Sequence, residues 1–244
     1  MIHAIVLAAL GAMPACWDVF DSALRHNAAA LHPPYVQYSE RISVTEDSAP
    51  LLMSFAQVDY RDDGVSRVSD ARFNYTPFVT RHAEPGPPEL GPYGEGREMW
   101  LPDPSGLPTI AQVRTEGRTT CTIAAHEPYK SHDTYHLVFG GGSPNRPQLK
   151  DLWVDTATHD IWKLIVTGPI WFFNDPEHPY GLAEFQVELG YNGPYLLVNH
   201  VVWKYRRHEY SQYVDYFGEY TFSGYSFPAS LPASYFGQET ASVK

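Results

Sequence analysis

Cysteine and charge are both scarce in this chain. Only two cysteines occur in 244 residues, so a framework of several disulfides is excluded, and Cys121 is expected to be a small buried residue. The fold must depend on a hydrophobic core, which a chain of this length can build. Charged residues make up 18% of the sequence, and the net charge of −11 would repel nucleic acid. No nucleic-acid partner is therefore expected.

The sequence also lacks the motifs that mark common enzyme classes. No Gly-x-Ser-x-Gly nucleophile elbow occurs, and Gly142-Ser143-Pro144 lacks the strand-to-helix context that such a turn needs. The C-terminal third contains no phosphate-binding glycine loop and no paired metal-ligand motif. The sequence therefore predicts a protein that is not an enzyme and that needs no cofactor.

The N-terminal segment is apolar and rich in small residues. No acidic residue, lysine or arginine precedes Asp18, and Ile2–Ala15 resembles the apolar and cleavage regions of a secretory signal without its basic start. The segment is too short to span a bilayer as a helix. We expect residues 1–15 to be a signal segment, residues 16–244 to form a single domain, and the protein to be periplasmic or extracellular. Two alternatives remain open, a lipid anchor on Cys16 and a buried N-terminal element of a cytosolic protein.

One amphipathic helix is expected near the N-terminus. Trp17, Phe20, Leu24 and Leu31 recur at spacings of three, four and seven residues, which places them on one face of a helix from Trp17 to Leu31. Pro33-Pro34 ends this helix.

Most of the remaining chain alternates apolar and polar residues with period two. The strands predicted from this alternation are Tyr35–Val44, Leu51–Arg61, Val65–Phe73, Thr109–Ala125, Thr134–Phe139, Leu152–Asp155, Asp160–Thr167, Ala183–Leu189, Tyr195–Arg206 and Glu209–Phe222. Short polar turns such as Asn192-Gly193 join the later strands, as in an antiparallel meander with one apolar face. The predicted fold class is mainly β (α+β), with a strongly curved antiparallel sheet or unclosed β-barrel wrapping the N-terminal helix.

One long segment interrupts this pattern. Glu84–Pro108 holds seven prolines and five glycines, so it cannot form a regular element. We expect it to lie over the surface, near the rim of a cavity.

Four motifs resemble the outer-membrane lipoprotein-carrier superfamily, as in a distant relative. They are the apolar start with its helix and the strand Tyr35–Glu40, the hairpin around Tyr60–Gly64, the segment Leu152–Thr158 with its Trp-x-Asp-x-x-Thr pattern, and the closing Tyr220–Tyr225 followed by Pro228, Pro232 and Phe236. The resemblance implies an unclosed β-barrel around helices, with an apolar cavity for acyl chains.

The function expected from these features is that of an exported binding or carrier protein for a lipid, a lipoprotein acyl chain or another hydrophobic ligand. About half of the strand aromatics are expected to be ordinary core, and the rest to line a cavity that one helix cannot fill. The residues predicted to contact the ligand are Trp162, Leu164, Phe185, Val187, Val201, Trp203, Tyr205 and Tyr216.

Two alternative functions stay open at this point. The first is a hydrolase, either metal-dependent through His126, His132 and His136, or acid–base through the carboxylates and imidazole of Asn174–Pro179. Lys130-Ser131 indicates a loop within the histidine group, which weakens the case for one metal site. The second is a structural envelope protein whose sheet meets a protein partner.

Overall fold

The computed structural model describes residues 13–31, 33–61, 66–75, 120–141, 148–171, 180–209, 212–232 and 235. This part of the chain forms one helix and ten strands. They are α1 (Cys16–Ala29), β1 (Tyr35–Glu46), β2 (Ala49–Arg61), β3 (Ser66–Tyr75), β4 (Thr120–Tyr129), β5 (His132–Gly140), β6 (Gln148–Asp155), β7 (Ile161–Trp171), β8 (Tyr180–Asn192), β9 (Tyr195–Glu209) and β10 (Gln212–Ser226).

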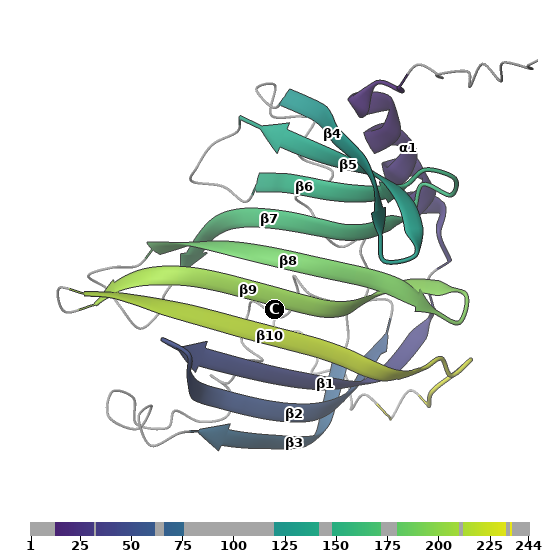
Figure 1. The fold of residues 1–244 in the computed structure, drawn as a ribbon. Helices are drawn as coiled ribbons and strands as arrows, with labels where there is room; N and C mark the ends of the chain where they lie inside the picture. Colours follow the sequence, from purple (N-terminus) through teal and green to yellow (C-terminus); the bar gives the residue numbers. More distant parts are fainter. Residues whose placement is uncertain are drawn as a thin grey trace, which may run out of the picture.

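All ten strands belong to one sheet, in the order β3-β2-β1-β10-β9-β8-β7-β6-β5-β4 (Figure 1). Every neighbouring pair is antiparallel. The strands β3 and β4 stand at opposite edges and do not pair with each other. The sheet is therefore open, and the predicted fold class is confirmed.

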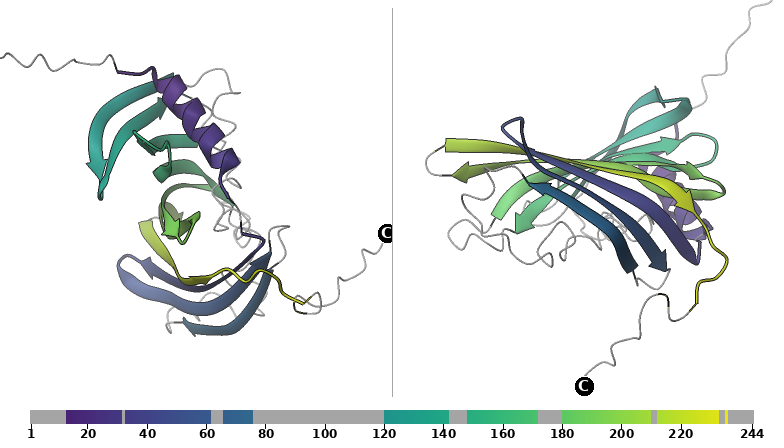
Figure 2. Two further views of the ribbon diagram at one scale, coloured as in Figure 1. Left: turned by 90° about the vertical axis from the view of Figure 1, so that its right-hand side faces the viewer. Right: turned by 90° about the horizontal axis from the view of Figure 1, so that it is seen from below.

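The sheet is strongly bent, and α1 lies against the inside of the bend (Figure 2). We call this side the concave face and the opposite side the convex face. The helix packs on β4 and β6, at one end of the sheet. The strands β8, β9, β10 and β1 form the middle and the far side of the bend, away from the helix.

The helix forms where the apolar stripe of the sequence predicted it. Val19, Phe20 and Ala23 are buried in the core. The ring of Phe20 meets that of Phe139 on β5 edge-on at 5.3 Å between centroids, and Trp17 lies 6.0 Å from the same ring. Such aromatic packing explains why the polar side of the helix points away from the sheet.

Tight turns connect the strands of the meander. Asp47 and Ser48, with φ of 44° and 69°, join β1 to β2, and Asn192 pairs with Tyr195 across a two-residue turn that begins with Gly193 at φ 62°. Backbones of this hand match the twist of antiparallel strands. The predicted strands from Leu152 onward are confirmed, and each of them, β6 to β10, is longer than expected.

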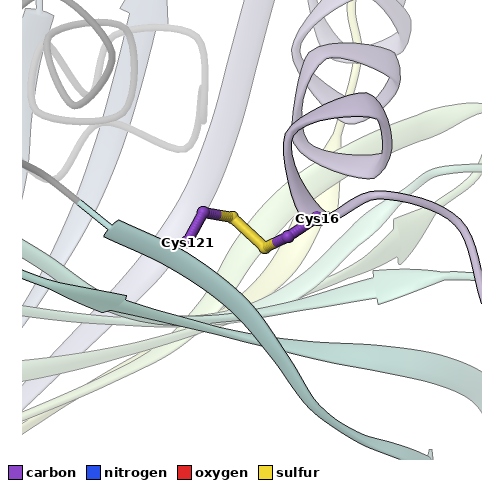
Figure 3. Close-up of a disulfide and its surroundings, with 2 residues drawn as sticks. All are labelled: Cys16 and Cys121. Atoms are coloured by element: carbon purple, nitrogen blue, oxygen red, sulfur yellow. A yellow bond between two sulfur atoms is a disulfide. The ribbon is translucent and has the colours of Figure 1, made fainter.

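The two cysteines form a disulfide, which corrects the expectation that Cys121 is simply a small buried residue. Cys16 starts α1 and Cys121 lies near the start of β4, with 5.7 Å between their Cα atoms (Figure 3). The two cysteines are 105 residues apart in the chain, so no local sequence pattern predicts that they form a disulfide. The bond ties the N-terminal end of the helix to an edge strand.

Several sequence predictions fall outside the described residues. These are most of Ile2–Ala15, the turn Asp62–Gly64, all of Glu84–Pro108, the first part of Thr109–Ala125, and Asn174–Pro179. Among the described residues, no helix has both the length and the apolar character needed to cross a membrane.

We predict that removing the disulfide lowers stability without changing the fold. A cross-link over about 100 residues restricts the unfolded chain, and its loss should reduce the free energy of unfolding by about 2–5 kcal/mol. Denaturant unfolding of the Cys16→Ser and Cys121→Ser variants would measure this. The double variant should match the singles and be insensitive to dithiothreitol. A wild type whose unfolding is unchanged by reduction would contradict the prediction.

Candidate ligand-binding face

The concave face is apolar across the middle strands. Leu164 on β7 lies opposite Val187 on β8, which lies opposite Val201 on β9. All three side chains are fully buried. They belong to the same core cluster as Phe20 of the helix and Phe222 of β10. The apolar surface is therefore continuous from the helix-covered end to the far side of the bend.

The structure places the predicted ligand-contacting residues along this face. Phe185 pairs with Trp203, and both side chains are partly buried. Trp162 and Tyr216 are buried at the two ends of the set. The backbone of Tyr205 pairs with Tyr216, while its side chain lies outside the described part of the structure.

Trp203 lies over a glycine of the neighbouring strand. Its partner in register is Gly218 on β10. A Cβ added to Gly218 would collide with the six-membered ring and Nε1 of Trp203. The glycine therefore lets the indole lie flat against the backbone of the neighbouring strand, which covers part of the face.

A cluster of aromatic rings lies where β1 and β10 meet. Tyr38 is 5.8 Å from Phe222 and 5.6 Å from Tyr225 between ring centroids. The Tyr225 hydroxyl donates to the Val198 carbonyl. Burial, and then the neighbouring Tyr38 and Glu40, raise the pKa of the Tyr225 phenol. This phenol therefore stays protonated and keeps donating.

Two polar residues on the concave face were not predicted as site residues. Glu40 and Ser54 are 3% and 5% exposed, and both point to the same side as Val36, Ile42 and their neighbours. The signal was present in the sequence, because period-two alternation over 36–44 puts Glu40 among apolar residues. Ser54 carries no such signal, since serine occurs on either face of a strand.

The hairpin between β6 and β7 shows what the Trp-x-Asp-x-x-Thr motif does. Asp155 Oδ1 accepts the backbone N–H groups of Ala157 and Thr158 at 2.9 and 3.0 Å, and Oδ2 accepts Trp162 Nε1–H at 3.2 Å. Burial works to raise the pKa of the Asp155 carboxyl, but these hydrogen bonds outweigh it and lower that pKa. The aspartate thus shapes the turn and orients an indole.

A second buried carboxylate joins this hairpin to the helix. Asp160 Oδ1 lies 2.9 Å from His26 Nε2 of α1 and accepts the Tyr191 hydroxyl at 3.0 Å, while Oδ2 accepts the Thr158 hydroxyl at 2.6 Å. Burial and the hydrogen bond to Asp160 raise the pKa of Tyr191 to about 12. The C-terminal half of α1 is therefore fixed to the sheet, as its N-terminal end is by the disulfide.

The three histidines of the metal-site alternative are held by separate carboxylates. His126 Nε2 is 2.8 Å from Asp133, and His136 Nε2 is 2.8 Å from Asp151. His132 stacks on the Trp162 indole with 3.6 Å between centroids. Within the described ranges, no group of three or more histidines, cysteines or acids is arranged to hold a metal ion. The acid–base alternative at Asn174–Pro179 lies outside those ranges.

The convex face carries its own polar and aromatic network. The ammonium of Lys163 lies 4.6 Å from the ring centroid of Trp153 and 5.8 Å from that of Tyr129. Lys130 pairs with Glu188 at 3.1 Å. Burial works to raise the pKa of the Glu188 carboxyl, but the hydrogen bond and charge of Lys130 outweigh it and lower that pKa. The alternation predicted from the sequence, apolar inside and charged outside, is thus observed on β7 and β8.

Comparisons with known proteins add little beyond this geometry. No family model matches the chain, and no curated protein matches its sequence. Among solved structures, it aligns with a LolA superfamily protein of Nitrosomonas europaea at 12% identity, over 90% of this chain and 96% of that one, with a TM-score of 0.38. LolA is the lipoprotein-carrier superfamily that the sequence motifs resemble.

Two further solved structures align over similar lengths. A DUF1329 family protein of Desulfovibrio piger has 10% identity, with 93% of this chain and 98% of that one covered and a TM-score of 0.45. MucB in the Pseudomonas aeruginosa MucA/MucB complex has 10% identity, with 84% and 93% covered and a TM-score of 0.26. None of these alignments identifies a ligand or partner for this chain.

We predict that Gly218→Ala destabilises the protein through Trp203. The added methyl group forces the indole off the sheet, at a cost of about 1–3 kcal/mol in the free energy of unfolding. In a Trp203→Ala background the same change should cost no more than about 0.5 kcal/mol, because nothing then occupies the space. Thermal unfolding of the wild type, the two single variants and the double variant would measure this double-mutant cycle. Equal costs in both backgrounds would show that the indole does not lie there.

We predict that Asp155→Ala lowers stability in a pH-dependent way. The lost hydrogen bonds to a carboxylate should cost about 1.5–3 kcal/mol at neutral pH. Because folding lowers this pKa, the stabilisation is complete above the ordinary aspartate pKa of about 4 and disappears as the pH falls through the folded value. The gap between wild type and variant should therefore narrow below about pH 4. Glu184→Ala, which breaks an exposed pair with Lys204, is the control, and a gap that widens in acid would refute the assignment.

Proposed function

We propose that this protein binds a lipid or another hydrophobic ligand against its concave face and acts without catalysis. The observation that carries the proposal is the extent of the apolar face, which runs across most of the sheet, whereas the helix packs at one end of it, on β4, β5 and β6. An apolar surface of this extent is the usual lining of a ligand site, with a few polar groups to orient the ligand.

The composition of the face supports an extended apolar ligand. The predicted contact residues combine aliphatic and aromatic side chains along four adjacent strands, β7 to β10. Trp203 and Phe185 lie opposite each other and are only partly buried, so their rings have surface left to cover a ligand. Aromatic faces pack well against acyl chains, and they keep water away from them.

An oxidising location outside the cytoplasm is part of the proposal. Disulfides persist in exported proteins and are rare in the cytosol, so the Cys16–Cys121 bond supports the export inferred from the apolar N-terminus. A sulfur in a disulfide cannot also carry a lipid. In the disulfide-bonded form, therefore, Cys16 is not a lipid anchor. The proposed ligand binding is attributed to the concave face of the sheet.

Catalysis receives no support from the described residues. His126, His132 and His136 are each paired with a carboxylate, Asp133, Asp155 and Asp151 respectively. A histidine–carboxylate pair needs a substrate site beside it to act as a general base.

The test uses contact quenching by a fatty alcohol that carries bromine on its terminal carbon. Bromine quenches indole fluorescence at short range, so a ligand on the concave face should quench Trp203 and spare Trp153 on the convex face. Trp203→Phe should therefore lose most of the saturable quenching, while Trp153→Phe should keep it. Native mass spectrometry of the protein purified from its own envelope would identify a co-purifying ligand.

The matched pair of tryptophan variants makes the outcome specific. Both substitutions keep an aromatic ring in the sheet and should leave the fold intact, which circular dichroism would verify. Quenching that is lost equally in both variants, or no saturable quenching at all, would defeat the proposal that the concave face binds an apolar chain.

A further inference from the structure

The apolar row of the concave face continues toward the helix. Leu164 on β7 pairs with Leu152 on β6, which in turn pairs with Leu137 on β5. The last member of the row is Ile123 on β4, opposite Leu137. All four side chains belong to the core or pack against it. The surface proposed to bind a ligand therefore extends to the edge strand, and α1, which packs there, covers its last part.

The first turn of α1 lies over the end of this row. The ring of Trp17 is 6.0 Å from that of Phe139 on β5, and only 3% of Phe139 is exposed. Cys121 is the partner of Phe139 in the β4–β5 pair. Its disulfide to Cys16 joins β4 to the same turn of the helix (Figure 3). The disulfide therefore holds Trp17 over Phe139.

The other attachments of α1 lie farther along the helix. Phe20 and Ala23 are buried in the core, and His26 Nε2 lies 2.9 Å from Asp160 Oδ1. These contacts hold the middle and the C-terminal half of the helix whether the disulfide is formed or not. Breaking the bond would therefore release the first turn and leave the rest of α1 in place.

The surroundings of the disulfide favour its reduction. Cys16 and Cys121 are only partly buried, so the bond is not sealed inside the core. Cys16 is the first residue of α1, and the N-cap residue Ala15 offers no side-chain hydrogen bond to the N–H groups of that turn. Those groups stabilise a thiolate on Cys16, and a stabilised thiolate leaves faster in thiol–disulfide exchange.

We propose that the Cys16–Cys121 disulfide is a redox latch that sets how much of the concave face α1 covers. This inference rests on the proposed function and adds a regulatory step to it. When a dithiol reduces the bond, the first turn of α1 is free to leave Phe139. The uncovered end of the row then binds a longer stretch of an apolar chain than the oxidised protein does.

The reductant is a dithiol, either the active site of a thiol–disulfide oxidoreductase or dithiothreitol. One thiolate of the dithiol attacks Sγ of Cys121, and the Cys16 thiolate leaves and takes up a proton. The second thiolate of the dithiol then attacks the reagent's own sulfur in the mixed disulfide. Cys121 is released as a thiolate and protonated, and the dithiol is oxidised to its disulfide.

The experiment compares octanol and dodecanol on the oxidised protein and on protein reduced with dithiothreitol, by calorimetry. Dodecanol should bind about tenfold more tightly to the reduced protein, because burying two further methylene groups is worth at least that much. Octanol is short enough to be accommodated on β7 to β9 in both forms and should gain much less. By linkage, dodecanol should shift the equilibrium with dithiothreitol toward the reduced protein by the same factor.

Three variants separate the parts of the latch. Cys16→Ser combined with Cys121→Ser should bind dodecanol as the reduced wild type does and should not respond to dithiothreitol. Trp17→Ala uncovers the same surface with the disulfide intact, so it should raise the dodecanol affinity of the oxidised protein. Asp18→Asn removes the acidic group of the first turn, which opposes a thiolate on Cys16, and should speed reduction severalfold. Lys204→Gln, on the convex face, is the control for all three measurements.

Hydrogen exchange shows whether reduction releases the first turn alone. The N–H groups of Asp18 and Val19 donate to the Ala15 carbonyl and should exchange faster after reduction, whereas those of residues 23–29 should keep their protection. Unchanged exchange, or protection lost throughout α1, would overturn the latch. Faster exchange of the first turn with equal dodecanol affinities in both forms would overturn control of binding and leave the apolar site in place. Binding of neither alcohol to either form would overturn the proposed function as well.

Discussion

The structure depends on the burial of one apolar face by a sheet that does not close. Strands β1, β2 and β5 to β10 contribute apolar side chains to one core on the inside of the bend, yet the edge strands β3 and β4 do not pair with each other. In a small closed barrel, side chains from opposite strands would pack together and fill the interior. In a sandwich, a second sheet would cover the apolar face. Here curvature brings distant strands into a single cluster that joins Tyr38 on β1 with Leu137 on β5. The face available for binding is thus a consequence of the way the sheet keeps water out.

The helix must be held in place because its apolar stripe is short. Phe20 anchors the middle of α1 in the core, but the three buried apolar residues of the helix cannot fix its orientation alone. The disulfide holds its first residue, and Asp160 holds His26 near its end. Asp160 in turn is positioned by the turn that Asp155 shapes. The motif that resembles a carrier family in the sequence therefore supports the helix, and this role needs no direct contact between its residues and a ligand.

The sequence predicted the meander and the sides of its strands because both depend on local chemistry. Alternation placed Val187 and Val201 inside and Lys163 and Glu188 outside, as observed. What it could not predict were contacts between residues far apart in the chain. Cys16 and Cys121 are joined across the fold, and the three histidines are separated by strand pairing that brings a different carboxylate to each. The strand predicted over Thr109–Ala125 is confirmed from Thr120 to Ala125, because Thr120 is the first described residue of that part of the chain.

The positions of Glu40 on β1 and Ser54 on β2 depend on the same alternation of side chains between the two faces. On β7 and β8, by contrast, the charged side chains of Lys163, Glu184 and Glu188 lie on the convex side. There they contact partners that are themselves close to solvent. Glu40 breaks this rule within a strand whose register is fixed by its apolar neighbours, so it cannot move outward without exposing Ile42 and Tyr38. A one-residue slip in the register of β1 would move every one of its side chains to the opposite face of the sheet. The register therefore holds the Glu40 carboxylate and the Ser54 hydroxyl on the inside of the bend, among the apolar side chains of β1 and β2.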